Sequence, residues 1–283
     1  MEILALCFLL LSVIILALVK PQPPQDEQYL PFYARNFAHR GLHDLSRGIP
    51  ENSLAAFRAA AENGYGMELD VHLTRDGEIV VIHDNDLKRA CGVDGTVKGS
   101  DFEYLRRLSL FGTEERIPTL SEVLETVGGK TPLIVELKVV SADYKELCEK
   151  TWSLLKDYKG DFCIESFDPF AVGWFNRRHA NVYRGQLIDT YSELSRSAPK
   201  IIAFFVANAL TNIISRPHFI AHSMGKKSLM VQLAEWLGAK KIVWTSRSEK
   251  DGERLETENS AVIFENYRPS PNITKNGNYN SAF

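Results

Sequence analysis

The chain has 283 residues, of which 45% are apolar and 24% are charged, an ordinary balance for a globular protein. Its 36 acidic and 33 basic residues leave a formal net charge of -3. This charge excludes the strongly basic character typical of nucleic-acid-binding proteins. The four cysteines are far apart and form no C-x-x-C pair, which argues against a disulfide framework and a cysteine zinc site. Nothing in the sequence identifies a protein partner.

The first segment is an almost uninterrupted apolar run, residues 3–19. As a helix it would be about 25 Å long, close to the ~30 Å of a bilayer's hydrocarbon core. A signal peptide is the competing interpretation, but it requires basic residues before the run and a small-x-small site after it. Here Met1 and Glu2 precede the run, and Lys20 and a proline-rich segment follow it. We therefore expect residues 1–20 to be an uncleaved transmembrane anchor.

The charges around this run predict an orientation. The nearest basic residues, Lys20, Arg35 and Arg40, all follow it. Since positive charges favour the cytoplasmic side, we expect a single-pass membrane protein with its C-terminal body in the cytoplasm. Residues 21–34 are predicted to be a linker, beginning with a stiff, polar spacer.

The body, residues 35–268, alternates short apolar runs with longer amphipathic segments. The predicted strands are 36–38, 66–71, 79–82, 133–137, 162–166, 183–187, 219–222, 242–245 and 261–264. The predicted helices are 53–63, 142–158, 169–178 and 226–237. This alternation is typical of a parallel sheet with covering helices, and its length favours a TIM (β/α)8 barrel. No G-x-G-x-x-G follows the first strand, which disfavours a Rossmann fold.

Three further segments depart from this alternation. Residues 85–115 contain few apolar runs and are expected to form an insertion over the active-site face. Residues 201–214 are apolar but too short to span a membrane, so we expect a buried barrel helix, with contact to the membrane surface as the alternative. Residues 269–283 are polar and predicted to be a disordered tail.

Polar side chains follow several of the predicted strands. Glu68 and Asp70 are two residues apart, so both project from the same face of their strand. Glu136 and Lys138 repeat this spacing on a second strand. Because barrel active sites form at the carboxyl ends of strands, we expect these groups to meet. Carboxylates held together require a positive partner, which is either a metal ion or the basic side chains themselves.

Several short motifs keep a common order along the body. They are His39-Arg40-Gly41, Pro50-Glu51-Asn52-Ser53, Glu68-Leu69-Asp70-Val71, Thr74-Arg75-Asp76-Gly77, Val80-Val81-Ile82-His83-Asp84, Glu136-Leu137-Lys138 and Glu165-Ser166-Phe167. In order and spacing the chain resembles the glycerophosphodiester phosphodiesterase family, whose fold is the barrel of the phospholipase C-like phosphodiesterases. The resemblance covers residues 37–265, although 192–226 match no motif of the family.

The resemblance implies a barrel that hydrolyses phosphodiesters with one divalent cation, in lipid metabolism. It implies that His39 and His83 are the general acid and base. The metal ligands would be Glu68, Asp70 and Glu136. The phosphate-binding residues would be Arg40 and Lys138, with Glu51 and Glu165 as secondary members of the site. Oxygen ligands without cysteine favour Mg²⁺ or Ca²⁺.

The implied substrate is a small-molecule or lipid phosphodiester, cleaved to an alcohol and glycerol phosphate. A lysophospholipase D-type cleavage of lysophospholipids is the alternative. A barrel that only binds phosphorylated ligands without turnover is the non-enzymatic hypothesis, and here every expected motif position is filled.

Overall fold

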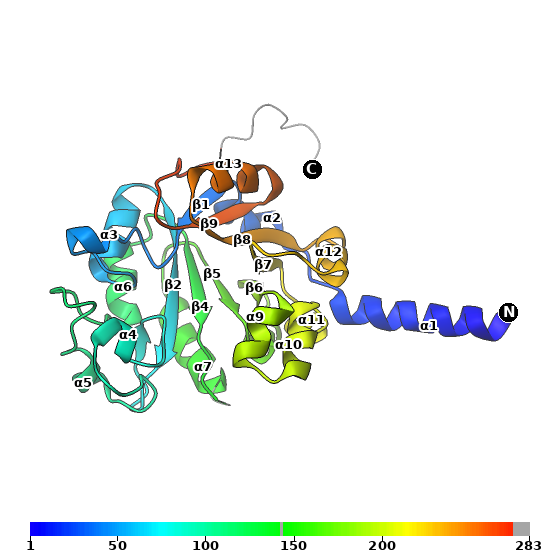
Figure 1. The fold of residues 1–283 in the computed structure, drawn as a ribbon, viewed down its shortest axis with the longest axis horizontal. Helices are drawn as coiled ribbons and strands as arrows, with labels where there is room; N and C mark the ends of the chain where they lie inside the picture. The colour runs from blue at the N-terminus through cyan, green and yellow to red at the C-terminus, as the bar shows by residue number, and fades with distance from the viewer. Residues whose placement is uncertain (142–143, 274–283) are drawn as a thin grey trace.

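The computed structural model, which describes residues 1–141 and 144–273, contains a closed barrel of eight parallel strands (Figure 1). The strands of the ring are β1 (Arg35–Ala38), β2 (Gly66–Leu73), β4 (Leu133–Leu137), β5 (Phe162–Ser166), β6 (Tyr183–Ile188), β7 (Phe219–Ser223), β8 (Lys240–Ser246) and β9 (Ala261–Phe264). The ring closes because β1 pairs in parallel with both β9 and β2. The predicted TIM-like fold is thereby confirmed.

The third predicted strand lies outside this ring. β3 (Ile79–Val81) runs antiparallel to the end of β2, with Val71 opposite Val81. The two strands are separated by a tight turn that contains Gly77, too short for the crossover that a parallel strand needs. Residues 79–82 are therefore an extended strand, but they form a hairpin with β2.

The insertion follows β3 and carries a small hydrophobic core of its own. Its short helices are α4 (Lys88–Cys91) and α5 (Phe102–Leu105). Leu87, Val97 and Leu105 are fully buried there against residues of β3. This satellite core explains why a segment with few regular elements can stand over the carboxyl ends of the strands.

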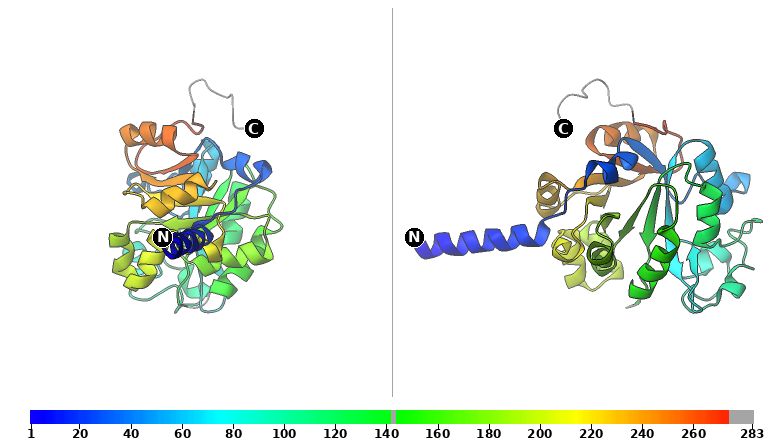
Figure 2. Two further views of the ribbon diagram at one scale, coloured as in Figure 1. Left: turned by 90° about the vertical axis from the view of Figure 1, so that its right-hand side faces the viewer. Right: turned by 180° about the vertical axis from the view of Figure 1, so that it is seen from behind.

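Helices cover the outside of the ring (Figures 1 and 2). They are α3 (Leu54–Glu62), α6 (Leu120–Val127), α7 (Tyr144–Leu155), α8 (Pro169–Arg178), α9 (Tyr191–Ser197), α10 (Lys200–Ala207), α11 (Asn212–Ser215), α12 (Leu229–Trp236) and α13 (Glu249–Glu258). The bounds of α8 agree with the prediction. The helix begins at Pro169 because the Asp168 side chain accepts hydrogen bonds from the N–H groups of its first turn. The helix predicted over 142–158 is seen as α7, which ends at Leu155; residues 142 and 143 lie outside the described ones.

Two of the helices that the pattern missed are α6 and α13. α6 has a capping box, in which Thr119 and Glu122 bond each other's backbone N–H groups. α13 begins after Ser248 and is mostly polar, with Gly252 and Leu255 as its buried residues. Both are short, so a search for long apolar periodicity overlooks them.

The apolar block 201–214 was expected to be one buried helix. It forms two helices instead, α10 and α11, and is only partly buried. Ala203, Val206 and Ala207 pack inward from α10, but Ile201 is 69% and Phe204 50% exposed. The block is apolar on both faces of α10, which explains why the sequence suggested full burial.

At the N-terminus, α1 (Glu2–Val19) projects away from the barrel as a single straight helix (Figures 1 and 2). It is 18 residues long, with a mean hydropathy of 3.0, and only 6% of it is buried. By length and composition it qualifies as a candidate membrane span.

The predicted linker, residues 21–34, contains short regular elements. It folds into α2 (Asp26–Tyr29) and a 3-10 turn, η1 (Leu30–Phe32). Tyr29 and Phe32 are buried against Phe37, Tyr183 and Phe219. The amino ends of the strands expose aromatic surface there, and burying it favours attachment of the segment.

The predicted disordered tail is packed where the structure describes it. Ile273 is buried, and its N–H donates to the carbonyl of Ala34 (2.8 Å). Ser270 accepts a hydrogen bond from Asn36 through its carbonyl oxygen (2.8 Å). The remainder of the predicted tail, residues 274–283, lies outside the described residues.

The packing of the barrel interior predicts that stability is sensitive to any side chain added at Gly185 in β6. A Cβ atom there would lie 2.0 Å from the ring of Phe219 on β7. We expect Gly185→Ala to lower the free energy of unfolding by about 1–3 kcal/mol through overpacking. Urea unfolding in mild detergent measures this. The double variant Gly185→Ala/Phe219→Leu should recover part of the loss, and full stability of the single variant would contradict this account.

Candidate active site

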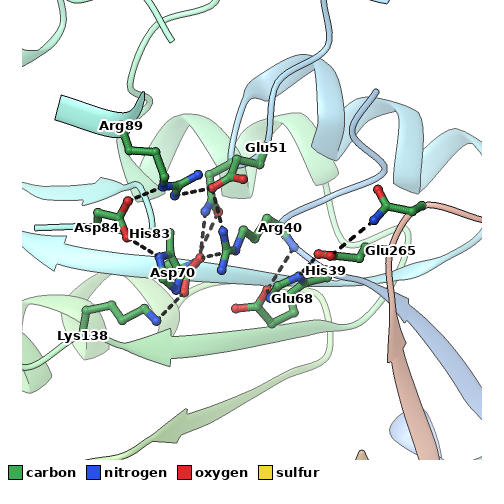
Figure 3. A network of polar contacts seen from close by, with 12 residues as sticks. His39, Arg40, Glu51, Glu68, Asp70, His83, Asp84, Arg89, Lys138 and Glu265 are labelled. Atoms are coloured by element: carbon green, nitrogen blue, oxygen red, sulfur yellow. Dashed lines mark hydrogen bonds and ion pairs between the residues drawn. The ribbon is translucent and has the colours of Figure 1, made fainter. Parts of the chain in front are cut away.

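Polar side chains gather at the carboxyl end of the barrel, and Figure 3 shows those on β2 and those that follow β1, β3, β4 and β9. The ladder places Asp70 of β2 beside Glu136 of β4, and Glu136 beside Glu165 of β5. Since these residues share one register level, their side chains reach the same layer of the barrel interior. Glu68 lies one layer below Asp70 on β2, and His39 and Arg40 directly follow β1.

Glu68, Asp70 and Glu136 form a buried triad of carboxylates. One oxygen of each lies within 4.8 Å of those of the other two, and all three side chains are buried. Burial and the charges of Asp70 and Glu136 raise the pKa of Glu68 well above its usual range. Burial raises the pKa of Glu136 to about 7. The three acids therefore require nearby positive charge if all are to be ionised.

Lys138 and Arg40 supply part of that charge. Nζ of Lys138 lies 3.0 Å from Oδ1 of Asp70 and 2.9 Å from Oε1 of Glu136. Burial acts to raise the pKa of Asp70, but Lys138 and other nearby positive charges hold it well below its usual range. Nε of Arg40 lies 3.6 Å from Oδ2 of Asp70. The two basic side chains thus both lie against Asp70, and Lys138 also pairs with Glu136.

The backbone around Arg40 is held in an unusual conformation. Arg40 and Asn52 both have positive φ, 55° and 54°, and Asn52 N–H donates to the Arg40 carbonyl (2.9 Å). This geometry directs the Arg40 N–H to Oε2 of Glu68 (3.0 Å), and Nδ2 of Asn52 to Oδ2 of Asp70 (2.8 Å). Gly41 follows with φ +80°, and its Cβ would lie 2.9 Å from Ala56. Strained backbone at a site of this kind is a mark of function.

Glu51 and Glu165 occupy different places around the triad. Glu51 accepts hydrogen bonds from Nη1 of Arg40 and Nη2 of Arg89, both at 2.8 Å, so it fixes the arginines. Glu165 lines the cavity, and its Oε2 is buried without a hydrogen-bond partner. Burial and the charge of Glu136 raise the pKa of Glu165 well above its usual range.

Each candidate histidine is hydrogen-bonded to a carboxylate. Nδ1 of His39 lies 2.6 Å from Oε2 of Glu265, and its Nε2 faces Glu68 at 3.9 Å. Nδ1 of His83 lies 2.6 Å from Oδ1 of Asp84. Burial lowers the pKa of both imidazoles, and that of His83 to about 4. With Nδ1 fixed in this way, Nε2 is the nitrogen left for chemistry.

A cavity of about 150 Å³ lies between these groups. Its polar lining includes both histidines, Arg40 and Lys138. Apolar side chains also line it, and they belong to Phe167, Leu187, Trp244 and Ile263. The cavity can therefore bind an anionic group together with an aliphatic or alcohol group.

The donors in this cavity fit a divalent cation. The triad offers three carboxylate oxygens, and Glu165 adds a fourth that lacks a partner. Hard cations such as Mg²⁺ and Ca²⁺ prefer oxygen ligands of this kind. Burial raises the pKa values of Glu68 and Glu136, and a cation bound at the triad would favour their ionised forms. The triad is thus consistent with a divalent metal site.

Comparison with known protein families gives one match over most of the chain. The model of the glycerophosphoryl diester phosphodiesterase family matches residues 39–267. The chain belongs to this family. The match begins at His39 and includes every site residue predicted from the sequence, which confirms the resemblance seen in the motifs.

Curated relatives share substantial identity with the chain. It is 40% identical over 145 residues to a glycerophosphodiester phosphodiesterase of Caldanaerobacter subterraneus, covering 48% of this chain and 58% of that one. It is 44% identical over 229 residues to a putative glycerophosphodiester phosphodiesterase of Bacillus subtilis, covering 77% and 88%. It is also 36% identical over 143 residues to a lysophospholipase D of Rattus norvegicus, covering 45% and 43%. The chain spans about half the length of several curated relatives it matches.

Solved structures share the fold. An Oleispira antarctica phosphodiesterase in complex with its product sn-glycerol-3-phosphate aligns with a TM-score of 0.67 at 22% identity, covering 82% of this chain and 93% of that one. A glycerophosphodiester phosphodiesterase of Thermotoga maritima aligns with a TM-score of 0.61 at 26% identity, covering 82% and 94%.

Sequence reasoning missed several residues of this site. Glu265 follows β9 as the other acids follow their strands, so the same signal of a polar residue at a strand end identifies it. Asn52 lies in the motif Pro50-Glu51-Asn52-Ser53, but its hydrogen bond to Asp70 depends on the positive φ of Asn52, which the sequence does not reveal. β2 was expected to end at Val71 but continues to Leu73, where Nε2 of His72 contacts the carbonyl oxygen of His83 at 3.0 Å. His72 therefore supports the hairpin beside the cavity.

The triad predicts that divalent cations stabilise the fold. A cation at 100 times its Kd should raise the free energy of unfolding by about 2.7 kcal/mol. For a chain of this size each kcal/mol shifts Tm by about 2–4 °C. Glu136→Gln should reduce the shift, whereas Glu265→Gln, which leaves the triad intact, should retain it. Calorimetry with and without Mg²⁺ or Ca²⁺ measures both, and an unchanged Tm in the native chain would contradict the metal site.

Proposed function

We propose that this protein hydrolyses glycerophosphodiesters to an alcohol and glycerol phosphate with the help of one divalent cation, Mg²⁺ or Ca²⁺. The observation that carries the proposal is the placement of two carboxylate-bound histidines on either side of the buried triad, within one cavity (Figure 3). Family membership and the similarity to curated phosphodiesterases support the same reaction.

Arg40 and Lys138 are proposed to bind the phosphate. A phosphodiester carries one negative charge, which repels the attacking oxygen and increases in the transition state. Both basic side chains line the cavity beside the triad, where Glu68, Asp70 and Glu136 would hold the cation. The cation, when bound, would neutralise further charge on the phosphate oxygens.

His39 and His83 are proposed to move the protons. With Nδ1 bound to a carboxylate, one imidazole can take a proton through Nε2 from the attacking hydroxyl. The other donates a proton to the leaving alkoxide, so that the P–O bond to the alcohol breaks as the new one forms. Burial lowers the pKa of both, which favours the neutral imidazole required of the base.

A lysophospholipid is the second candidate substrate. Its hydrolysis by the same chemistry would release the head-group alcohol and leave the phosphate on an acylated glycerol. Two observations favour it: the apolar part of the cavity lining, formed by Phe167, Leu187, Trp244 and Ile263, and the candidate membrane helix α1. Similarity to the rat lysophospholipase D adds support.

We also propose that α1 is an uncleaved anchor, followed by the linker 21–34 and the catalytic barrel 35–268 with its insertion at 85–115. Val19 is fully buried against the barrel, and Nδ2 of Asn212 donates to its carbonyl oxygen (2.8 Å). Because the end of the helix is part of the packed body, removing a signal peptide at this point would expose buried apolar surface. A bilayer-held barrel meets lipid substrates at high effective concentration.

The reaction is tested on the purified full chain in detergent. We expect release of glycerol phosphate from glycerophosphocholine, loss of activity in excess chelator and recovery on adding Mg²⁺ or Ca²⁺. A parallel assay with lysophosphatidylcholine, scored for lysophosphatidic acid, separates the two substrate classes. Undiminished hydrolysis in excess chelator would refute the metal dependence.

The same assay tests the proton-transfer residues. His39→Ala and His83→Ala should each lower kcat by about 10²–10⁴-fold, because each loses one proton-transfer step. His179→Ala is the matched control, since His179 stacks on Trp152 outside the barrel. Wild-type rates in both active-site variants would show that the acid and base lie elsewhere.

The anchor predicts a topology. Lys20, Arg35 and Arg40 follow the helix, so the barrel should lie in the cytoplasm. In sealed right-side-out cells or vesicles, an external protease should leave the barrel intact until the membrane is permeabilised. Digestion of the barrel without permeabilisation would place it on the outer side.

A further inference from the structure

Exposed apolar side chains gather on one side of the barrel. Beyond residue 19, eight of the thirteen large apolar residues that the described structure leaves exposed lie between residues 201 and 236. Six of them form what we call the α10–α12 patch: Ile201, Ile202, Phe204, Phe205, Leu229 and Trp236. Trp236 is 80%, Leu229 75% and Ile201 69% exposed, so these side chains are left almost fully in solvent by the barrel itself.

The two helices of the patch are fixed to the body and to each other. α10 packs inward through Ala203, Val206 and Ala207, which leaves its other side chains facing outward. α12 packs inward through Val231 and Ala234. The hydroxyl of Ser228, at the start of α12, donates to the carbonyl of Ala207 at the end of α10 (3.3 Å). Exposed apolar side chains gathered in this way mark an interaction site.

The base of α1 is held on the same side of the barrel. Val19 packs with Val231 and Ala234, which are the inward residues of α12. Arg216 donates to the carbonyl of Lys20 (2.8 Å). The linker continues this attachment, because Nη2 of the buried Arg184 donates to Oε1 of Gln22 (2.7 Å). The helix therefore leaves the barrel in a fixed direction.

The views along and across α1 show what surrounds its base. In the left view of Figure 2, which looks toward the end of α1, α12 lies on one side of the helix and α9 and α10 on the other. Figure 1 shows the same arrangement from the side, with α11 beside the base. A bilayer crossed by α1 must therefore come close to α10 and α12.

The residues around the patch match the chemistry of a membrane surface. Trp236 is of the type that concentrates at the boundary between headgroups and acyl chains. Lys20 ends α1 and Lys200 begins α10, and both are exposed. Their ammonium groups suit the phosphates of lipid headgroups, while the apolar side chains suit the acyl chains.

We propose that the α10–α12 patch inserts into the surface of the same bilayer that α1 spans. The barrel then rests on the membrane through two helices in addition to its anchor. α9 and α10 follow β6, and Leu187 of β6 lines the cavity, so the contact lies in the same β/α unit as one part of the cavity lining. The inference rests on the proposed anchoring by α1, and its test separates the two.

The test uses the full chain in phosphatidylcholine vesicles with brominated or unmodified acyl chains, since bromine quenches tryptophan on contact. The emission of Trp236 is obtained by subtracting the spectrum of Trp236→Phe. In unmodified vesicles we expect this emission to lie at shorter wavelength than that of a tryptophan in water. In brominated vesicles we expect it to lose most of the intensity that it has in unmodified ones. Ile202→Trp in the Trp236→Phe background should be quenched in the same way. Tyr104→Trp in that background is the control, because Tyr104 is exposed on the insertion, and it should not be quenched.

Flotation of the same vesicles reports on α1 independently. If the protein floats with the vesicles but Trp236 and the tryptophan at position 202 are not quenched, the patch proposal is wrong and the anchor stands. A blue shift without quenching would indicate that a second copy of the chain covers the patch, which also overturns the proposal. If the protein does not float, the anchor and the patch fail together.

Discussion

The structure depends on one electrostatic problem, which is how to hold several carboxylates in the interior of a barrel. Glu68, Asp70 and Glu136 are buried within a few ångströms of one another, and Glu165 lies beside them. Separated from water, such acids lose their charge unless cations stabilise it. Lys138 and Arg40 provide part of this stabilisation, and the donor set leaves room for a divalent ion to provide the rest.

Surrounding features of the site serve this arrangement. The parallel register brings Asp70, Glu136 and Glu165 to one level, and the left-handed backbone at Arg40 and Asn52 turns hydrogen-bond donors toward the acids. The hairpin formed by β2 and β3 brings His83 to the rim opposite His39. The imidazoles, the basic side chains and the acidic residues thus converge because the strands of the barrel end at the same edge.

The sequence predicted the barrel and the side chains that meet at its carboxyl end, because both rest on local signals. A strand followed by a polar residue is visible in the chain at His39, Glu68 and Glu136, and closure of the barrel aligns such positions. The sequence did not predict that 79–82 would pair antiparallel outside the ring, since periodicity does not report the partner of a strand. Nor did it predict the positive φ of Asn52, which is set by tertiary contacts.

The largest error concerned surfaces. Composition gave no sign that the linker 21–34 packs aromatic side chains on the barrel, and it made 201–214 look like a buried helix, which the structure contradicts. Whether an apolar residue is covered depends on what else the fold leaves open, such as the aromatic floor of the barrel beneath Tyr29 and Phe32. This information resides in distant segments, so no window of sequence contains it.

The attachment of α2 and η1 to that floor sets where the chain can be shortened. A soluble version that starts after Phe32 would open the aromatic base of the barrel to water and deprive the Arg184 guanidinium of Gln22. A version that starts at Lys20 keeps both, although it loses the packing of Val19 together with the rest of α1. The segment from Pro21 to Phe32, which a domain diagram would draw as a dispensable linker, therefore closes the amino end of the barrel.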